Sequence, residues 1–127
     1  MDLAPEHRED IIAHARSVAP EECCGLVGAR DGRSARVVRM TNAAHSRLRF
    51  EVDPGEVMDA FDALDRDGLE VAALYHSHTR TEPYPSQTDI TYAKGWGPGT
   101  LWIIVGLAGD EPELRIYRID DGAVTAL

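Results

Sequence analysis

The sequence predicts an α/β (α+β) fold, in which a mixed, mostly antiparallel β-sheet is flanked by helices within one domain spanning residues 1–127. Two stretches, 5–18 and 53–67, carry apolar residues at helical spacing. Two short apolar runs, 69–77 and 100–107, are typical of buried strands. A chain of 127 residues is long enough to bury one core and too short for two domains of ordinary size.

The first third of the chain predicts one helix followed by three strands. Pro5 suits the first turn of a helix that Pro20 ends. Apolar stretches at 23–29 and 34–40, joined by the turn sequence DGR, predict a β-hairpin. The alternation in 47–52 (RLRFEV) predicts a third strand.

The rest of the chain predicts two more helices and four more strands. Asp53 is a suitable N-cap for the second helix, and Gly68 suits its end. A buried strand at 69–77 precedes a short helix at 86–94. The remaining strands are expected at 100–107, 113–119 and 123–127.

Composition argues against several classes of function. The chain has 13 basic and 22 acidic residues, a formal net charge of -9, whereas a nucleic-acid-binding protein needs a clustered basic surface. No apolar run approaches membrane-spanning length, and the N-terminus lacks the apolar core of a signal peptide. Cys23 and Cys24 are adjacent, which is too close for an unstrained disulfide, so we expect both to be reduced. We therefore expect a cytoplasmic protein with no nucleic-acid or membrane partner.

Two histidines separated by one residue stand at the C-terminal end of a predicted strand. His76 and His78 point to the same face of that strand, so both imidazoles can bind one metal ion. Asp89 adds a carboxylate if the intervening loop folds back, and three protein ligands with an open fourth position are the pattern of catalytic zinc. An isolated H-x-H pair is more often structural, however. Ser86 and Asp89 also form a helix capping box, so both interpretations of these residues stay open.

The joint spacing is more specific than its parts. His76 and His78 are followed, after seven intervening residues, by Ser86 and then Asp89. This pattern, H-x-H, seven residues, then S-x-x-D, resembles the signature of the JAMM (MPN+) zinc metallopeptidases. The resemblance implies a fold similar to that of the cytidine deaminases and one zinc ion per chain, held by both histidines and Asp89.

The family also carries a catalytic glutamate upstream of its metal ligands, in a setting similar to P-x-E-x-C-G. Residues 20–25 are PEECCG, so the matching residue is Glu22, with Glu21 as the alternative. Taken alone, either glutamate is better explained as a solvated charge between a helix and a strand. The resemblance implies that Glu22 is the general base and that Ser86 donates a hydrogen bond to the developing oxyanion.

The resemblance extends over nearly the whole chain. The segments TNAAHS, RFEVDPGEVMDAFDAL and LRIYRIDDGAV are similar to those of small bacterial members, especially the actinobacterial type. Those members release cysteine from the C-terminus of a ubiquitin-like sulfur-carrier protein, which implies such a carrier as the partner. Thr79 stands where many members, including eukaryotic deubiquitinases, have proline, and this also favours the sulfur-carrier branch. Two alternatives remain: an isopeptidase that removes ubiquitin-like modifiers from lysines, and a non-catalytic MPN-type scaffold.

Overall fold

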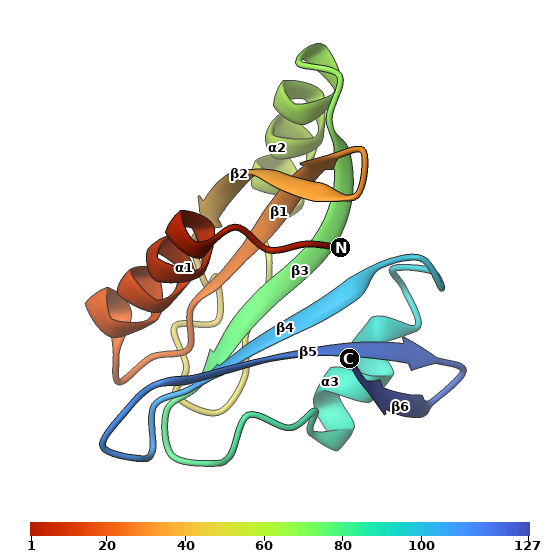
Figure 1. Ribbon diagram of the computed structural model, residues 1–127. Coiled ribbons are helices and arrows are strands. Elements are labelled where there is room, and N and C mark those ends of the chain that lie inside the picture. Colours follow the sequence, from red (N-terminus) through yellow and green to blue (C-terminus); the bar gives the residue numbers. More distant parts are fainter.

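Six strands form one sheet in the computed structural model, which describes residues 1–127 (Figure 1). In chain order the elements are α1 (Pro5–Val18), β1 (Cys24–Arg30), β2 (Arg33–Met40), α2 (Pro54–Arg66), β3 (Glu70–His78), α3 (Gln87–Ala93), β4 (Leu101–Gly106), β5 (Glu113–Asp120) and β6 (Ala123–Ala126). The strands lie in the order β2-β1-β3-β4-β5-β6, and among them only β3 and β4 pair in parallel. The predicted mixed, mostly antiparallel α/β (α+β) fold is confirmed.

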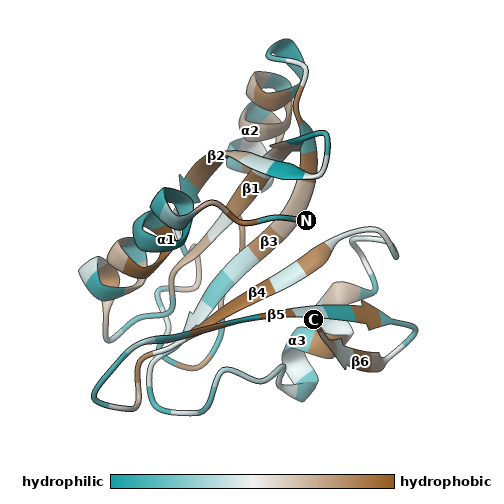
Figure 2. Ribbon diagram, in the orientation of Figure 1, coloured by the Kyte–Doolittle hydropathy of each residue, from teal (hydrophilic) through white to brown (hydrophobic).

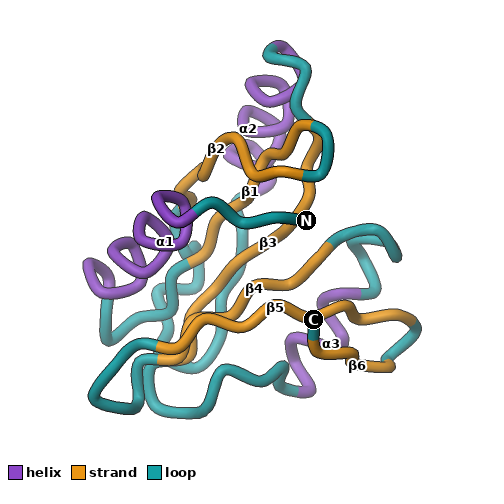
Figure 3. The backbone as a smooth tube through the Cα atoms, in the orientation of Figure 1, coloured by secondary structure: helices purple, strands orange, loops and turns teal.

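The helices cover both faces of the sheet (Figures 1 and 3). On one face, apolar residues of α1 pack against alternate residues of the central strands, and this cluster includes Ile11, Ile12, Ala15, Val27, Ala73, Tyr75, Ile103 and Val105. On the other face, α2 and α3 cover Leu26, Leu74, Trp102 and Ile104. Because side chains alternate along a strand, β3 and β4 contribute to both clusters and are buried on both sides. The hydrophilic colour at the C-terminal end of β3 marks where this apolar pattern stops (Figure 2).

The ends of α2 follow the predicted signals. Asp53 caps the helix by accepting a hydrogen bond from the Glu56 backbone N–H at 3.0 Å, and Pro54 occupies the first turn. Gly68, just past the helix, has a positive φ of 70°, a conformation that glycine adopts without strain. This helix leads directly into β3 and so sets where the histidine-bearing strand begins.

The predicted strand at 47–52 is wrong: this segment is a loop without regular secondary structure (Figure 3). Its backbone is bound by a side chain instead of by a neighbouring strand. The Glu51 N–H donates to Asn42 Oδ1, and the Arg49 carbonyl accepts from Asn42 Nδ2, each at 3.0 Å. Phe50 inserts into the core from the loop and Val52 packs against that core, whereas Leu48 is 82% exposed. The alternation in RLRFEV therefore does not reflect pairing in the sheet.

Besides the apolar packing, one buried hydrogen bond joins α1 to β3. His14 Nδ1 and Tyr75 Oη lie 2.6 Å apart, and both side chains are buried. Tyr75 also lies across Gly25 in β1, where an added Cβ would approach the ring to 2.2 Å. Cys23 and Cys24 are both buried and unpaired, as expected. No helix combines the length and apolar character needed to cross a membrane.

Candidate active site

The two predicted metal-binding histidines occupy the last residues of β3. His76 pairs with Cys24 in β1 and with Ile104 in β4, and both histidines are buried, with exposures of 0% and 5%. Phe50 stacks on the imidazole of His76, with ring centroids 4.6 Å apart and an interplanar angle of 27°. Packing against Phe50 therefore limits the rotation of the His76 ring. The side chains of His76 and His78, two residues apart on β3, lie on the same face of the sheet.

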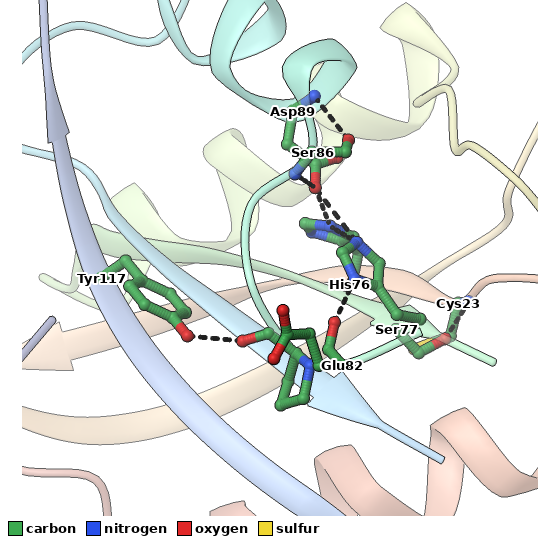
Figure 4. Close-up of polar contacts among 9 residues, drawn as sticks. Cys23, His76, Ser77, Glu82, Ser86, Asp89 and Tyr117 are labelled. Atoms are coloured by element: carbon green, nitrogen blue, oxygen red, sulfur yellow. Dashed lines mark hydrogen bonds and ion pairs between the residues drawn. The ribbon is translucent and has the colours of Figure 1, made fainter. Parts of the chain in front are cut away.

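Asp89 reaches these histidines from the first turn of α3, as Figure 4 shows. Ser86 is the N-cap of that helix: its Oγ accepts from the Asp89 N–H at 3.1 Å, and its own N–H donates to Asp89 Oδ2 at 2.9 Å. The same Oδ2 lies 3.1 Å from Nε2 of both His76 and His78. The capping box and the metal-ligand arrangement are thus built from the same atoms, so the two interpretations of this segment are compatible.

The three side chains fit a tetrahedral zinc ion. His76 Nε2 and His78 Nε2 are 3.2 Å apart, and each is 3.1 Å from Asp89 Oδ2. Zinc bonds of about 2.0–2.1 Å in a tetrahedron place ligand atoms about 3.3 Å apart. His78 Nδ1 donates to the Glu82 carbonyl at 2.9 Å, so in the neutral ring the lone pair is on Nε2, the atom that faces the other two ligand atoms. A carboxylate and two imidazoles are a preferred ligand set for zinc.

The charge states of these groups favour cation binding. Burial alone raises the pKa of Asp89, but hydrogen bonds from His76 and His78 outweigh it and hold the pKa well below its usual range. Burial, the largest effect, lowers the pKa of His76, against the opposing hydrogen bond and charge of Asp89. For His78, hydrogen bonds to Asp89 and Glu82 outweigh burial and raise the pKa. An ionised Asp89 between two imidazoles is a ligand set that suits a divalent cation.

Glu22 lies in the loop between α1 and β1 and is 4% exposed. Its Oε1 has no hydrogen-bond partner in the protein. Burial raises the pKa of the carboxyl to about 8, although the His78 charge lowers it, and the Asp89 charge raises it further. Glu21 is different: its side chain is 40% exposed and pairs with His45 at 3.2 Å. The structure therefore turns Glu22 inward toward the metal-ligand cluster and Glu21 outward.

The loop between β3 and α3 is fixed by two adjacent carbonyls (Figure 4). The Glu82 carbonyl accepts the hydrogen bond from His78 Nδ1, and the Pro83 carbonyl accepts from Tyr117 Oη at 2.5 Å. The Pro83 ring also packs on Gly106, where an added Cβ would approach it to 2.7 Å. Tyr117 in β5 therefore helps to hold the peptide that orients His78, a role that no local sequence pattern indicated.

Comparison with known sequences places the chain in a family. A sequence profile described as "Prokaryotic homologs of the JAB domain" matches residues 4–120. The chain belongs to this prokaryotic JAB family. The resemblance drawn from the spacing of its histidines, serine and aspartate is thereby confirmed.

Named relatives of this JAB domain are peptidases. The chain is 39% identical over 118 residues to the CysO-cysteine peptidase of Mycobacterium tuberculosis, covering 91% of this chain and 80% of that protein. It is 31% identical over 108 residues to the desampylase of Pyrococcus furiosus, covering 85% of this chain and 76% of that protein. These relatives support a hydrolase.

Solved structures support the same fold for this JAB domain. A solution structure from Desulfitobacterium hafniense aligns with a TM-score of 0.88 and 30% identity, covering 99% of this chain and 88% of that one. A JAB1/MPN domain protein from Archaeoglobus fulgidus aligns with a TM-score of 0.66 at 21% identity, covering 98% and 94% of the two chains. The second likeness concerns the fold alone.

Two hollows in the surface of the JAB domain differ in size and in whether predicted site residues line them. A cavity of about 270 Å³ lies against Glu22 and is lined also by Glu21 and Asn42. A larger hollow of about 760 Å³ lies beside Lys94 and Arg118, at the far end of α3, and contains none of the predicted site residues. The volume of a hollow is therefore not a guide to the site here, because the larger hollow is not lined by the only buried His-His-Asp cluster in the chain.

Proposed function

We propose that the chain is a zinc-dependent metallopeptidase that acts on a ubiquitin-like sulfur-carrier protein. It would hydrolyse the amide bond after the carrier's C-terminal Gly-Gly-type tail and release cysteine from a carrier–cysteine adduct, as a step in cysteine biosynthesis. The observation that carries the proposal is the fit of three buried ligand atoms to zinc beside a buried, unpartnered glutamate. The CysO-cysteine peptidase relatives support the choice of substrate.

His76, His78 and Asp89 would hold the zinc ion. Bound zinc supplies Lewis acidity, which acidifies water and polarises the carbonyl under attack. Phe50 and the Glu82 carbonyl hold the two imidazoles in place, so little reorganisation accompanies binding.

Glu22 would act as the general base. Its carboxyl is buried and Oε1 has no partner in the protein, so it is free to take a proton from the attacking water and to return one to the departing amine. Ser86 would donate a hydrogen bond to the carbonyl oxygen as that atom becomes negative. Its Oγ already accepts from the Asp89 N–H, and its O–H stays free to donate outward. Each side chain thus has a distinct role in one acyl-transfer reaction.

We infer that residues 1–127 act as a single catalytic domain in the cytoplasm, with no nucleic-acid or membrane partner. The acidic net charge supports the absence of a nucleic-acid partner. The two unpaired cysteines, Cys23 and Cys24, are consistent with a reducing compartment.

The test uses a carrier–cysteine adduct and mass spectrometry. Wild-type protein should convert the adduct to free carrier and cysteine, and Glu22→Gln should retain zinc but lose about 10²–10⁴-fold in rate. Glu21→Gln is the matched control and should stay near the wild-type rate. Full activity in metal-replete Glu22→Gln would show that the base is assigned wrongly.

A second substrate class is supported by the desampylase relatives. An isopeptidase would remove a ubiquitin-like modifier from a protein lysine with the same side chains. Incubating a lysine-linked conjugate and the cysteine adduct in parallel separates the two: loss of the conjugate with an intact adduct would favour the isopeptidase. Well under one zinc per purified chain, with neither substrate cleaved, would instead favour a non-catalytic scaffold.

A further inference from the structure

One side chain organises the long loop between β2 and α2. Asn42 is buried, and its Oδ1 accepts from the N–H groups of Ala44 and Glu51, each at 3.0 Å. Its Nδ2 donates to the carbonyls of Glu22 and Arg49, each at 3.0 Å. The Ser46 carbonyl also lies 3.4 Å from Nδ2. Both donors and both acceptor positions of the amide are therefore in use.

The loop that Asn42 organises holds the backbone of Glu22 on both sides. The Glu22 carbonyl accepts from Asn42, and the Glu22 N–H donates to the Ser46 carbonyl at 2.8 Å. The next residue, Cys23, donates its N–H to Ser77 Oγ at 2.8 Å, between the two histidines of β3 (Figure 4). The position of the Glu22 carboxyl relative to the metal ligands is thus set by the Asn42 loop on one side and by β3 on the other.

The same loop also contacts the metal-ligand half of the site. Phe50, eight residues after Asn42, stacks on His76 at a centroid distance of 4.6 Å. The carbonyl of Arg49, directly before Phe50, is one of the two acceptors 3.0 Å from Asn42 Nδ2. A displacement of the Asn42 amide would therefore move Glu22 and the ring that covers His76 together.

We propose that Asn42 is a positioning residue for the base, coupling Glu22 to the loop that covers His76; this rests on the proposed peptidase function. The amide group is needed because the carbonyls around Nδ2 require a donor and the two N–H groups around Oδ1 require an acceptor. Aspartate has the same shape but no donor, and its charge would face the carbonyls of Glu22, Ser46 and Arg49. Asn42 touches no reacting atom, so it acts only through the residues that it holds.

The test measures zinc content, kcat and KM for Asn42→Ala and Asn42→Asp. Zinc content should stay near one per chain, because the ligands lie on β3 and α3. We expect kcat to fall by about 10–100-fold with KM changed less than about threefold, since a misplacement of about 1 Å costs up to about 10²-fold in rate. Asp53→Ala is the control: it removes the α2 cap at the other end of this loop without touching Glu22.

A double-mutant cycle separates positioning of the base from a general loss of structure. In a Glu22→Gln background, Asn42→Ala should lower the residual rate by less than about threefold, because the base that Asn42 positions is already absent. Amide hydrogen exchange gives a readout independent of activity: the Glu22 N–H should exchange faster in Asn42→Ala than in Asp53→Ala. If the Asn42 effect is the same in both backgrounds, the positioning role is wrong.

The remaining outcomes are also decisive. A wild-type kcat in Asn42→Ala and Asn42→Asp would overturn the proposal. Failure of both variants to fold with zinc bound would overturn it too, because Asn42 would then be needed for the fold as a whole and not for positioning Glu22. An inactive wild type would instead refute the peptidase function. A Glu22→Gln variant as active as wild type would refute only the assignment of the base.

Discussion

Replacing Glu22 by glutamine should make the metal-free protein more stable at neutral pH. Burial, the largest effect, raises the pKa of this carboxyl from its ordinary 4.5 to about 8, with His78 opposing and Asp89 adding to the shift. A carboxyl with a higher pKa in the folded chain supports folding fully below pH 4.5, where it is protonated in both states. That contribution is lost as the pH rises through 8. Glutamine keeps the shape and removes the titration.

The size of the effect follows from the two pKa values. Each pH unit between them costs about 1.4 kcal/mol of folding free energy. For Glu22 this gives about 1 kcal/mol at pH 5 and about 3 kcal/mol at pH 7. The free-energy difference between wild type and Glu22→Gln should therefore grow by about 2–3 kcal/mol between these two conditions.

Urea unfolding of chelator-treated protein measures this difference. Trp102 is fully buried, so its fluorescence reports loss of the core. Glu21→Gln is the matched control, because it removes a neighbouring carboxyl whose side chain is 40% exposed, and its difference from wild type should stay constant within about 0.5 kcal/mol. A constant difference for Glu22→Gln as well would refute the argument that burial disfavours the charged form of this carboxyl.

Two further outcomes concern the surroundings of the site. Tyr117→Phe removes the hydroxyl that binds the Pro83 carbonyl and should weaken zinc binding by about tenfold in a chelator competition assay. Tyr84→Phe, in the same loop as Pro83, should leave zinc binding unchanged. Equal zinc affinities of the Tyr117→Phe variant and wild type would contradict the role of this contact. Gly25→Ala would put a methyl group 2.2 Å from the Tyr75 ring and should lower the free energy of unfolding by about 1–3 kcal/mol, a prediction that an unchanged urea midpoint would contradict.

Most of the elements could be predicted because each depends on neighbours along the chain. The buried runs at 69–77 and 100–107 became β3 and β4, and the Asp53 and Gly68 signals mark the ends of α2. The exception, 47–52, has the alternation of a strand but lies in a loop. A period of two in the sequence records neither which partner satisfies the backbone nor whether each apolar side chain is buried, and Leu48 in this segment is 82% exposed.

The roles of Asn42 and Tyr117 could not be predicted by the same reasoning. Asn42 lies 20 residues from Glu22, and Tyr117 lies 34 residues from Pro83. The segment TNAAHS contributed only to the family resemblance, and the LRIYRI strand showed nothing but alternation. Contacts between distant segments leave no periodic signal in a single sequence.

The sequence by itself determined the types and the local geometry of the proposed ligand residues. Residues two apart on a strand share a face, and a serine three residues before an aspartate caps a helix, so His76 with His78 and Ser86 with Asp89 follow from backbone periodicity. Only the tertiary structure decided that Asp89 Oδ2 lies 3.1 Å from both rings and that Glu22, not Glu21, is buried beside them. These distances depend on how α1, α3 and the loop after β2 pack around the end of the sheet, and packing is a property of the whole chain.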